Sequence, residues 1–195
     1  MMRTNLIGTL LAASILAATA AACSSSTASP ASTGDAGGAT DAGDSQTPPI
    51  GASAITAWLA SGVYKSWHCE SAVHDARSPS PHNVDRVCSN DVIASGATGA
   101  GPWPAGAAAV KELYASTTDA TPGGYAVYLK TQATSANGAN WYYYGALTAG
   151  GTVVDGMGSD ATVMAQCTSC HLAAGSDAAH TPSPGGRDEV YTPVH

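Results

Sequence analysis

Basic residues are scarce in this chain, which has 195 residues but only 7 Lys and Arg together. Without a stripe of positive charge it lacks the electrostatic footprint that holds a phosphate backbone, so we expect no nucleic-acid partner. The 14 Asp and Glu residues give a net charge of −7, and part of it comes from Asp35, Asp41 and Asp44 in a low-complexity segment. The length suits a single domain.

Long apolar runs are also missing once the first 22 residues have passed. A helix that crosses a membrane needs about 20 consecutive apolar residues, and no later segment provides them. Residues 1–22 combine Arg3 with a short apolar stretch, an alanine-rich run and small residues at the end. This combination is typical of a secretory signal peptide, so we expect export.

Cys23 follows this segment directly. The run Ala20-Ala21-Ala22-Cys23 resembles a bacterial lipoprotein processing site, with Ala20 where leucine is usual. Lipidation of Cys23 would bind the protein to a membrane by a lipid anchor only, and Ser24 favours the outer membrane. Ordinary cleavage with Cys23 left as a spare thiol is the alternative. The expected location is therefore the periplasm or the outer membrane.

Residues 23–52 are almost entirely Ser, Thr, Ala, Gly, Pro and Asp, with Ile50 as the one large apolar side chain. Such a segment cannot bury enough apolar surface to offset the entropy lost on ordering. We therefore expect a disordered tether over 23–52 and a folded domain over 53–195.

The motif with the clearest chemistry is Cys167-Thr168-Ser169-Cys170-His171. This spacing is typical of c-type haem attachment, in which Cys167 and Cys170 bond the haem vinyl groups and His171 becomes an axial iron ligand. A redox dithiol and half of a zinc site are the alternatives. The sequence offers no second CxxC or HxxxH pair for zinc and no βαβ context for a thioredoxin-like dithiol. The expected cofactor is one covalently bound haem c.

No methionine follows His171: the four are Met1, Met2, Met157 and Met164. Small electron-transfer cytochromes use a downstream methionine as the second axial ligand, so the sequence favours an open sixth iron position. His180 and His195 are downstream alternatives, but both are more typical of surface histidines. Four-helix cytochromes are excluded because Gly, Pro and Thr interrupt the middle of the chain too often for long helices.

The remaining cysteines are Cys69 and Cys88. An oxidising compartment favours a disulfide between them, which would close a loop of about 20 residues and contribute about 3 kcal/mol. Two separate buried thiols are the alternative.

The chain is predicted to be α+β and mainly β, built on an antiparallel sheet with a few short helices. Ser53 is expected to cap a helix that buries Ile55, Trp58 and Leu59 and ends at Gly62. A second helix is expected at 160–166, and loops at 76–83 and 177–186, with a turn at Asn90-Asp91. Extended segments are expected at 63–69, 84–88, 107–114, 124–131, 140–147, 152–154 and 190–192.

The order of five segments resembles the cytochrome P-460 family, which includes the cytochrome c′-beta proteins. The segments are 104–113, 124–130, 140–144, the haem motif and 188–192. The resemblance covers about residues 54 to 195. It implies a mainly antiparallel β domain, usually a homodimer, with a five-coordinate c-type haem.

In the P-460 members a lysine is also cross-linked to the haem and hydroxylamine is oxidised, whereas the c′-beta members bind nitric oxide in an apolar distal pocket. By motif match the cross-linking lysine is Lys111, in Val110-Lys111-Glu112. The distal carboxylate of the hydroxylamine-oxidising members falls near Ala126, which cannot accept a proton. The side chain of Glu112 should project from the face of the strand opposite to that of Lys111. This departure favours gas binding or a different redox reaction.

Three functions remain open from the sequence. They are a haem oxidoreductase that acts on hydroxylamine or a similar small nitrogen species, a nitric oxide-binding module, and an outer-membrane electron-transfer cytochrome c. The expected partners are a small-molecule ligand or substrate, a redox partner protein and, from the resemblance, a second copy of the chain. Whether the protein is an enzyme stays undecided at this point.

Overall fold

The computed structural model describes residues 46–147, 151, 153–181 and 183–195. The expected signal peptide, Cys23 and the tether up to residue 45 lie outside the described residues, as does Thr152 at the start of one expected strand. In the described ranges, no helix has both the length and the apolar character needed to cross a membrane.

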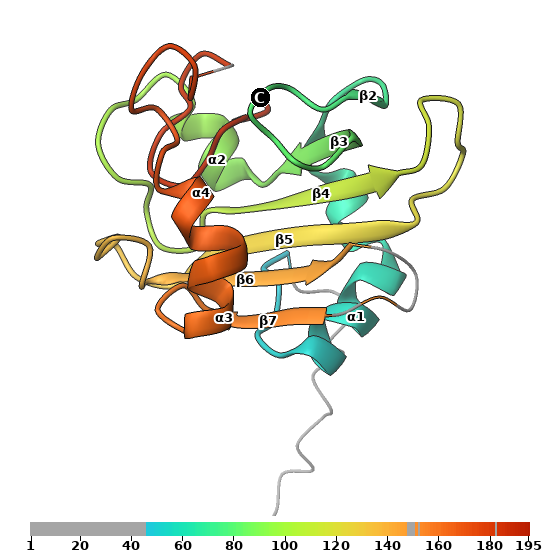
Figure 1. Ribbon diagram of the computed structural model, residues 1–195, viewed down its shortest axis with the longest axis horizontal. Helices are drawn as coiled ribbons and strands as arrows, with labels where there is room; N and C mark the ends of the chain where they lie inside the picture. Colours follow the sequence, from blue (N-terminus) through green and yellow to red (C-terminus); the bar gives the residue numbers. More distant parts are fainter. Residues whose placement is uncertain (1–45, 148–150, 152, 182) are drawn as a thin grey trace, which may run out of the picture. The chain divides into compact units, whose positions relative to one another are not determined.

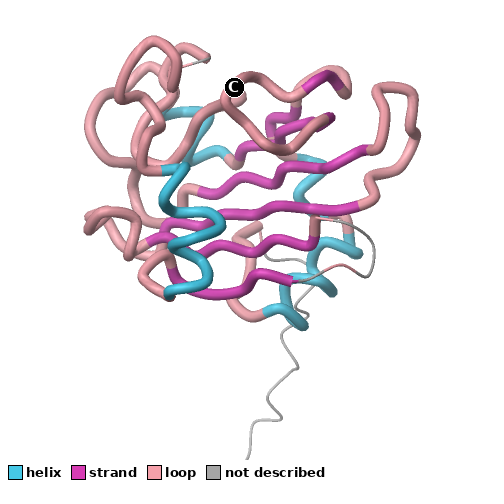
Figure 2. The backbone as a smooth tube through the Cα atoms, viewed as in Figure 1, coloured by secondary structure: helices cyan, strands magenta, loops and turns pink. Residues whose placement is uncertain are grey.

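Seven strands form one antiparallel sheet in the described residues, which confirms the α+β, mainly β expectation. The order across the sheet is β1-β3-β4-β5-β6-β7, and β2 pairs with the same side of β3 as β1 does. Figures 1 and 2 show the central strands side by side in chain order. The strands are β1 (His68–Cys69), β2 (His74–Asp75), β3 (Val84–Ser89), β4 (Ala108–Tyr114), β5 (Gly124–Lys130), β6 (Trp141–Ala146) and β7 (Val153–Met157).

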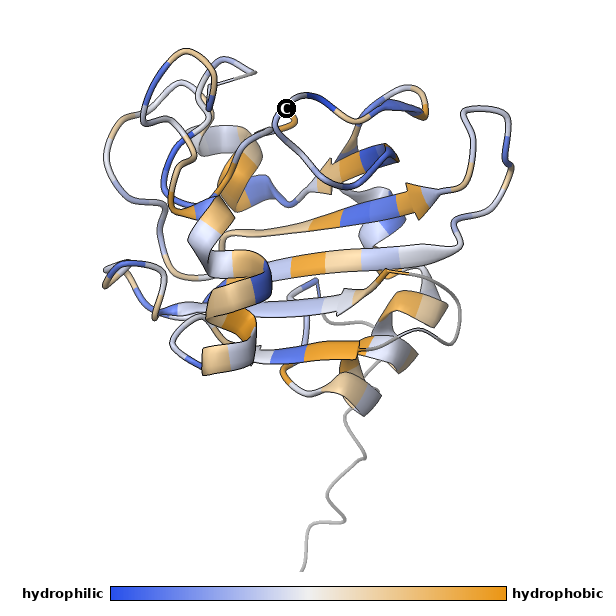
Figure 3. Cartoon of the chain, in the orientation of Figure 1, coloured by the Kyte–Doolittle hydropathy of each residue, from blue (hydrophilic) through white to orange (hydrophobic). Residues whose placement is uncertain are grey.

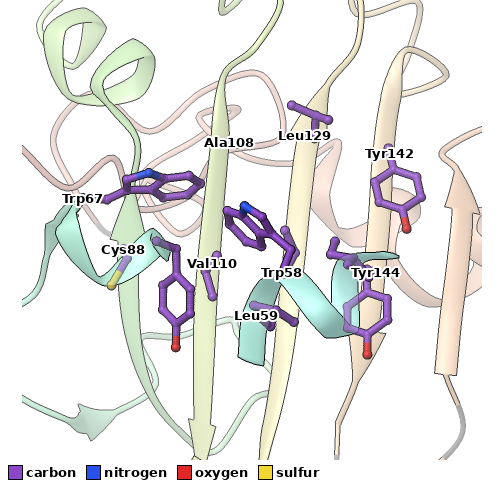
Figure 4. Packing of buried hydrophobic residues seen from close by; sticks show 12 residues of the cluster. Trp58, Leu59, Trp67, Cys88, Ala108, Val110, Leu129, Tyr142 and Tyr144 are labelled. Atoms are coloured by element: carbon purple, nitrogen blue, oxygen red, sulfur yellow. The ribbon is translucent and has the colours of Figure 1, made fainter. Parts of the chain in front are cut away.

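One face of the sheet is covered by the helix α1 (Ala52–Ser61) and the 3₁₀ turn η1 (Val63–Ser66). The predicted helix face of Ile55, Trp58 and Leu59 is buried there. These side chains meet every second residue of the strands, as the two-residue period of a strand requires. Figure 4 shows this packing for Trp58, Leu59, Trp67, Cys88, Ala108, Val110, Leu129, Tyr142 and Tyr144.

The other face carries α2 (Asp91–Gly96) and a continuous helical segment that contains the Cys167–His171 motif. The segment consists of α3 (Ala161–Val163), a π-helical turn η2 (Met164–Thr168) and α4 (Ser169–His171). Figure 1 shows it crossing the front of the sheet from β7 towards β4. Its apolar contacts include Tyr128, Trp141 and Tyr143, so this face, opposite α1, positions the motif.

Several sequence expectations are corrected by the structure. The first helix begins at Ala52, not with Ser53 as its cap. The N-terminal end of this helix is instead capped by Asp155, whose Oδ2 accepts from Ala52 N at 2.8 Å. Residues 63–66 form a 3₁₀ turn rather than an extended segment, because Gly62 adopts a left-handed conformation and the chain turns there.

Three further corrections concern local hydrogen bonding. Asn90-Asp91 is not a turn, because the Asn90 side chain accepts from Ile93 N at 3.3 Å and caps α2. The helix expected at 160–166 continues to His171. Residues 190–192 do not form a strand, because positive φ angles at Asp188 and Glu189 leave a single bridge between Arg187 and Val190.

The Cys69–Cys88 disulfide is confirmed, since the two residues face each other across β1 and β3. Replacing both cysteines by alanine should lower the free energy of unfolding by about 3 kcal/mol, because the bond closes a loop with a sequence separation of 19. Urea denaturation gives this difference. Reduction of the unmodified chain should reproduce the loss, and equal midpoints for oxidised and reduced chains would contradict it.

Candidate haem site

His171 lies at the end of the helical segment with its ring between the helix and the sheet. Three tyrosine rings meet it edge-on, with centroid distances of 5.6 Å for Tyr128, 5.4 Å for Tyr143 and 5.7 Å for Tyr191. The π-helical turn that contains the first two residues of the motif is held to the turn after β7 by Thr168, whose hydroxyl donates to Gly158 O at 3.0 Å. The imidazole is therefore confined on several sides.

A single hydrogen bond fixes the protonation of this ring. His171 Nδ1 lies 2.6 Å from Glu189 O, and a carbonyl oxygen can only accept, so Nδ1 carries the hydrogen. Burial, with a smaller effect from Lys111, lowers the pKa of His171 to about 4. The ring is therefore neutral at pH 7 and its Nε2 has a free lone pair, the state that a metal ligand requires.

The turn that presents the Glu189 carbonyl is unusual. Asp188 and Glu189 have φ angles of 46° and 71°, in the left-handed region that side chains other than glycine seldom occupy. Lys130 Nζ donates to Asp188 Oδ2 at 2.6 Å, and Trp103 N donates to the same oxygen at 2.7 Å. Ser135 Oγ also donates to Asp188. This network holds a backbone conformation that costs energy.

The Glu189 side chain is buried against the same site. Its Oε2 accepts from the Tyr143 hydroxyl at 2.7 Å. Burial raises the pKa of Glu189 to about 7, although the Tyr143 bond opposes the rise. Sequence reasoning placed Asp188 and Glu189 in a matching segment but assigned them no role, and nothing local in the sequence marks the contact with His171.

Cys167 and Cys170 are free thiols on neighbouring turns of the segment, the first half-buried and the second exposed. Burial raises the pKa of Cys167, so it is a thiol rather than a thiolate at pH 7. Each cysteine borders a different pocket, and His171 borders both. The three motif residues thus surround one region in front of the sheet.

The two pockets have volumes of about 600 and 450 Å³ with their solvent openings included. A row of residues aligned across the strands forms much of their floor: Val87, Lys111, Ala126, Gly145 and Val154. Ala126 and Gly145 are neighbours in this row, and their small size leaves the hollow open.

Lys111 and Ala126, the two positions given by the resemblance, face each other across β4 and β5 on this face. Lys111 Nζ forms an ion pair with Asp85 at 2.9 Å and donates to Ser80 Oγ at 3.4 Å. Glu112 points to the opposite face, towards Tyr64. Figure 3 shows the charged pair of β4 as a blue segment between apolar stretches.

The downstream histidines lie elsewhere. His180 Nδ1 is 2.8 Å from Asp177 Oδ1, and His195 Nδ1 is 3.3 Å from Pro193 O. Neither lines the pockets beside His171. His82, from the proline-rich loop 76–83, lines both instead. Nothing local in the sequence indicates this position of His82, because it depends on how the loop folds over the sheet.

One further cluster has side chains of metal-ligand type: Glu70, His74 and Asp85. Its carboxylates are already paired, Glu70 with Arg77 at 2.6 Å and Asp85 with Lys111 at 2.9 Å. His74 Nε2 is bonded to Glu70 at 2.9 Å. Arg77 and Lys111 therefore neutralise the two carboxylates, which leaves no net negative charge to attract a metal ion. The cluster instead links the 76–83 loop to the sheet.

The motif, the pockets and the row of small residues therefore come together on one face of the sheet. No protein-family model, curated protein or solved structure matches the chain.

Proposed function

We propose that this chain is an exported mono-haem c-type cytochrome, similar to the P-460 and c′-beta proteins, that binds or acts on small nitrogen species. Haem c would be attached at Cys167 and Cys170, with His171 as its axial ligand. The observation that carries the proposal is the His171 imidazole, whose Nδ1 donates to Glu189 O and which lines both pockets, one together with Cys167 and the other together with Cys170.

The residues present fit such a group. The Glu189 carbonyl makes the imidazole a stronger base and fixes its orientation, as hydrogen-bond partners of metal-bound histidines do. Tyr128 and Tyr143 keep water from one side of the ring. When bound, the haem would supply a redox-active iron with a position for a small ligand.

Binding is favoured over hydroxylamine oxidation. A proton acceptor near the ligand would assist oxidation, but Asp85 is the one carboxylate that lines either pocket in the described residues. It is 2% exposed and already paired with Lys111. Oxidation would also pass electrons to a redox partner protein. With no unpaired carboxylate among the described lining residues, the pockets suit binding of nitric oxide better than oxidation of hydroxylamine.

Expression of the full chain with the haem c maturation machinery tests the proposal. Haem should stay on the polypeptide after denaturation, and the Cys167→Ser/Cys170→Ser variant should lose it because no thioether can form. The Cys69→Ser/Cys88→Ser variant is the matched control and should keep its haem. Absence of covalent haem from the unmodified chain would overturn the proposal.

Spectra of the loaded protein test the Lys111 assignment. A strongly red-shifted ferrous Soret band that is lost in Lys111→Ala would indicate a cross-link to the haem. A normal high-spin c-type spectrum, unchanged in that variant, would exclude it. A low-spin, six-coordinate spectrum would instead favour the alternative function, an electron-transfer cytochrome c of the outer membrane.

A further inference from the structure

Two polar side chains beside His171 have no hydrogen-bond partner within the part of the chain that the structure describes. They are His82, in the loop between β2 and β3, and Tyr128 on β5. With His171, they are the residues common to both pockets. Tyr128 is only 8% exposed, but its hydroxyl is not a fully buried atom without a partner; in the described residues that holds for Trp141 Nε1 alone. Unpartnered groups where two pockets meet indicate a place for a polar ligand.

The loop that carries His82 is fixed rather than free. Its ends are joined by Ala76 N, which donates to Asn83 O at 2.7 Å. Ser80 Oγ accepts from His82 N at 3.3 Å and from Lys111 Nζ at 3.4 Å, which ties the loop to β4. The imidazole is therefore presented to the pockets by an anchored backbone.

His82 can donate a hydrogen bond into the pockets. An imidazole carries at least one N–H whether it is neutral or protonated, so the donor is present in either state.

Charge in the pockets favours an uncharged ligand. Arg77 and Lys111 are the cations that line them, and each is paired with a carboxylate, Glu70 at 2.6 Å and Asp85 at 2.9 Å. An anion would find no unpaired positive charge there. Among the described residues, the lining of the pocket at Ala126 and Gly145 contains no Asp, Glu, Lys or Arg.

We infer that His82 is the residue that hydrogen-bonds the ligand at this site, and that the ligand is a small uncharged nitrogen–oxygen species. The inference rests on the proposed function, because it needs a haem at His171. It assigns to the 76–83 loop a polar contact that Ala126 and Gly145 on the sheet floor cannot provide.

Carbon monoxide bound to the ferrous, haem-loaded full chain is the probe. His82→Leu should move the C–O stretching band to higher frequency, because a hydrogen bond to the ligand oxygen is lost. Nitric oxide should dissociate about five- to tenfold faster, the effect of one hydrogen bond. His82→Gln keeps an N–H donor, so its C–O band and its dissociation rate should lie between those of the unmodified chain and those of His82→Leu. His180→Leu, on the surface loop, is the matched control and should match the unmodified chain.

An unchanged C–O band and dissociation rate in His82→Leu, with haem still attached, would overturn this inference and leave the proposed function standing. A low-spin resting spectrum that becomes high-spin in His82→Leu would also overturn this inference, because His82 would then be an iron ligand, and it would favour the electron-transfer alternative. A chain without covalent haem would overturn the proposed function, and this inference with it.

Discussion

Replacing Lys130 by Met should lower the free energy of unfolding by about 3–5 kcal/mol, because it removes one partner of a buried ion pair. Lys130 is 0% exposed, and its Nζ lies 2.6 Å from both Asp188 Oδ2 and Ser135 Oγ. Without the ammonium group, the Asp188 carboxylate would stay buried with neutral donors only. Urea denaturation of the haem-free chain, followed by tryptophan fluorescence, measures the loss.

The matched variant is Lys130→Met/Asp188→Asn. Removing both charges should cost less than removing Lys130 alone, because no unpaired carboxylate remains. A loss below about 1 kcal/mol for Lys130→Met would contradict the argument, since that is the range of exposed pairs.

The same substitution should also disturb His171. Asp188 helps hold the left-handed turn whose Glu189 carbonyl accepts from His171 Nδ1. Nitrogen NMR of the haem-free chain should therefore show a mixture of imidazole tautomers in Lys130→Met and one tautomer in the unmodified chain. A variant that is destabilised but keeps a single tautomer would limit Lys130 to a purely structural role.

Lowering the pH should weaken the Lys130–Asp188 ion pair, and the pKa of Asp188 sets the pH range in which this happens. Burial alone would raise the pKa of Asp188, but hydrogen bonds from Lys130, Ser135 and Trp103 hold it below its ordinary value. The unfolded chain therefore binds the proton first as pH falls. The stability from Asp188 is present above its ordinary pKa and is lost as pH falls through the lower folded value.

The central strands were predictable because their sequences leave few alternatives. The four strands β3 to β6 lie within one or two residues of the expected ranges, since β-favouring residues end at Gly, Pro and Asn clusters. Cys69 and Cys88 were likewise paired correctly. The strands were predictable from residues within each segment, and the disulfide was predictable because few cysteines remained to be paired.

The parts of the site that were missed depend on contacts between distant segments. His82 approaches His171 only because the loop folds over β4, and the Glu189 carbonyl reaches His171 only because Asp188 is paired with Lys130. Val190-Tyr191-Thr192 has the composition of a strand, yet the preceding turn prevents pairing. Tertiary contacts override local preference there.

The hydrogen bonds of Glu112, on the face of the sheet away from the pockets, fix the register of β4 and so determine that Lys111 projects towards the pockets. Its carboxylate is 1% exposed and accepts from Arg86 Nε at 2.8 Å, Tyr64 OH at 2.7 Å and Tyr114 OH at 2.8 Å. Burial and the bond to Glu112 raise the pKa of Tyr114 to about 12, so its hydroxyl remains a donor. A slip of one residue in β4 would bury Lys111 in this network and turn Glu112 towards His171.

Glu112→Ala should therefore lower the free energy of unfolding by about 3–5 kcal/mol, because it leaves Arg86 unpaired and the Tyr64 hydroxyl buried without an acceptor. Glu112→Gln keeps an acceptor oxygen and the side-chain volume, so its loss should be smaller, about 1–3 kcal/mol. Equal losses in the two variants would show that the charge matters and the hydrogen bonds do not. Because β4 joins this network to the pocket floor, destabilisation of Glu112→Ala should also loosen Lys111, which hydrogen exchange of the β4 amides would reveal.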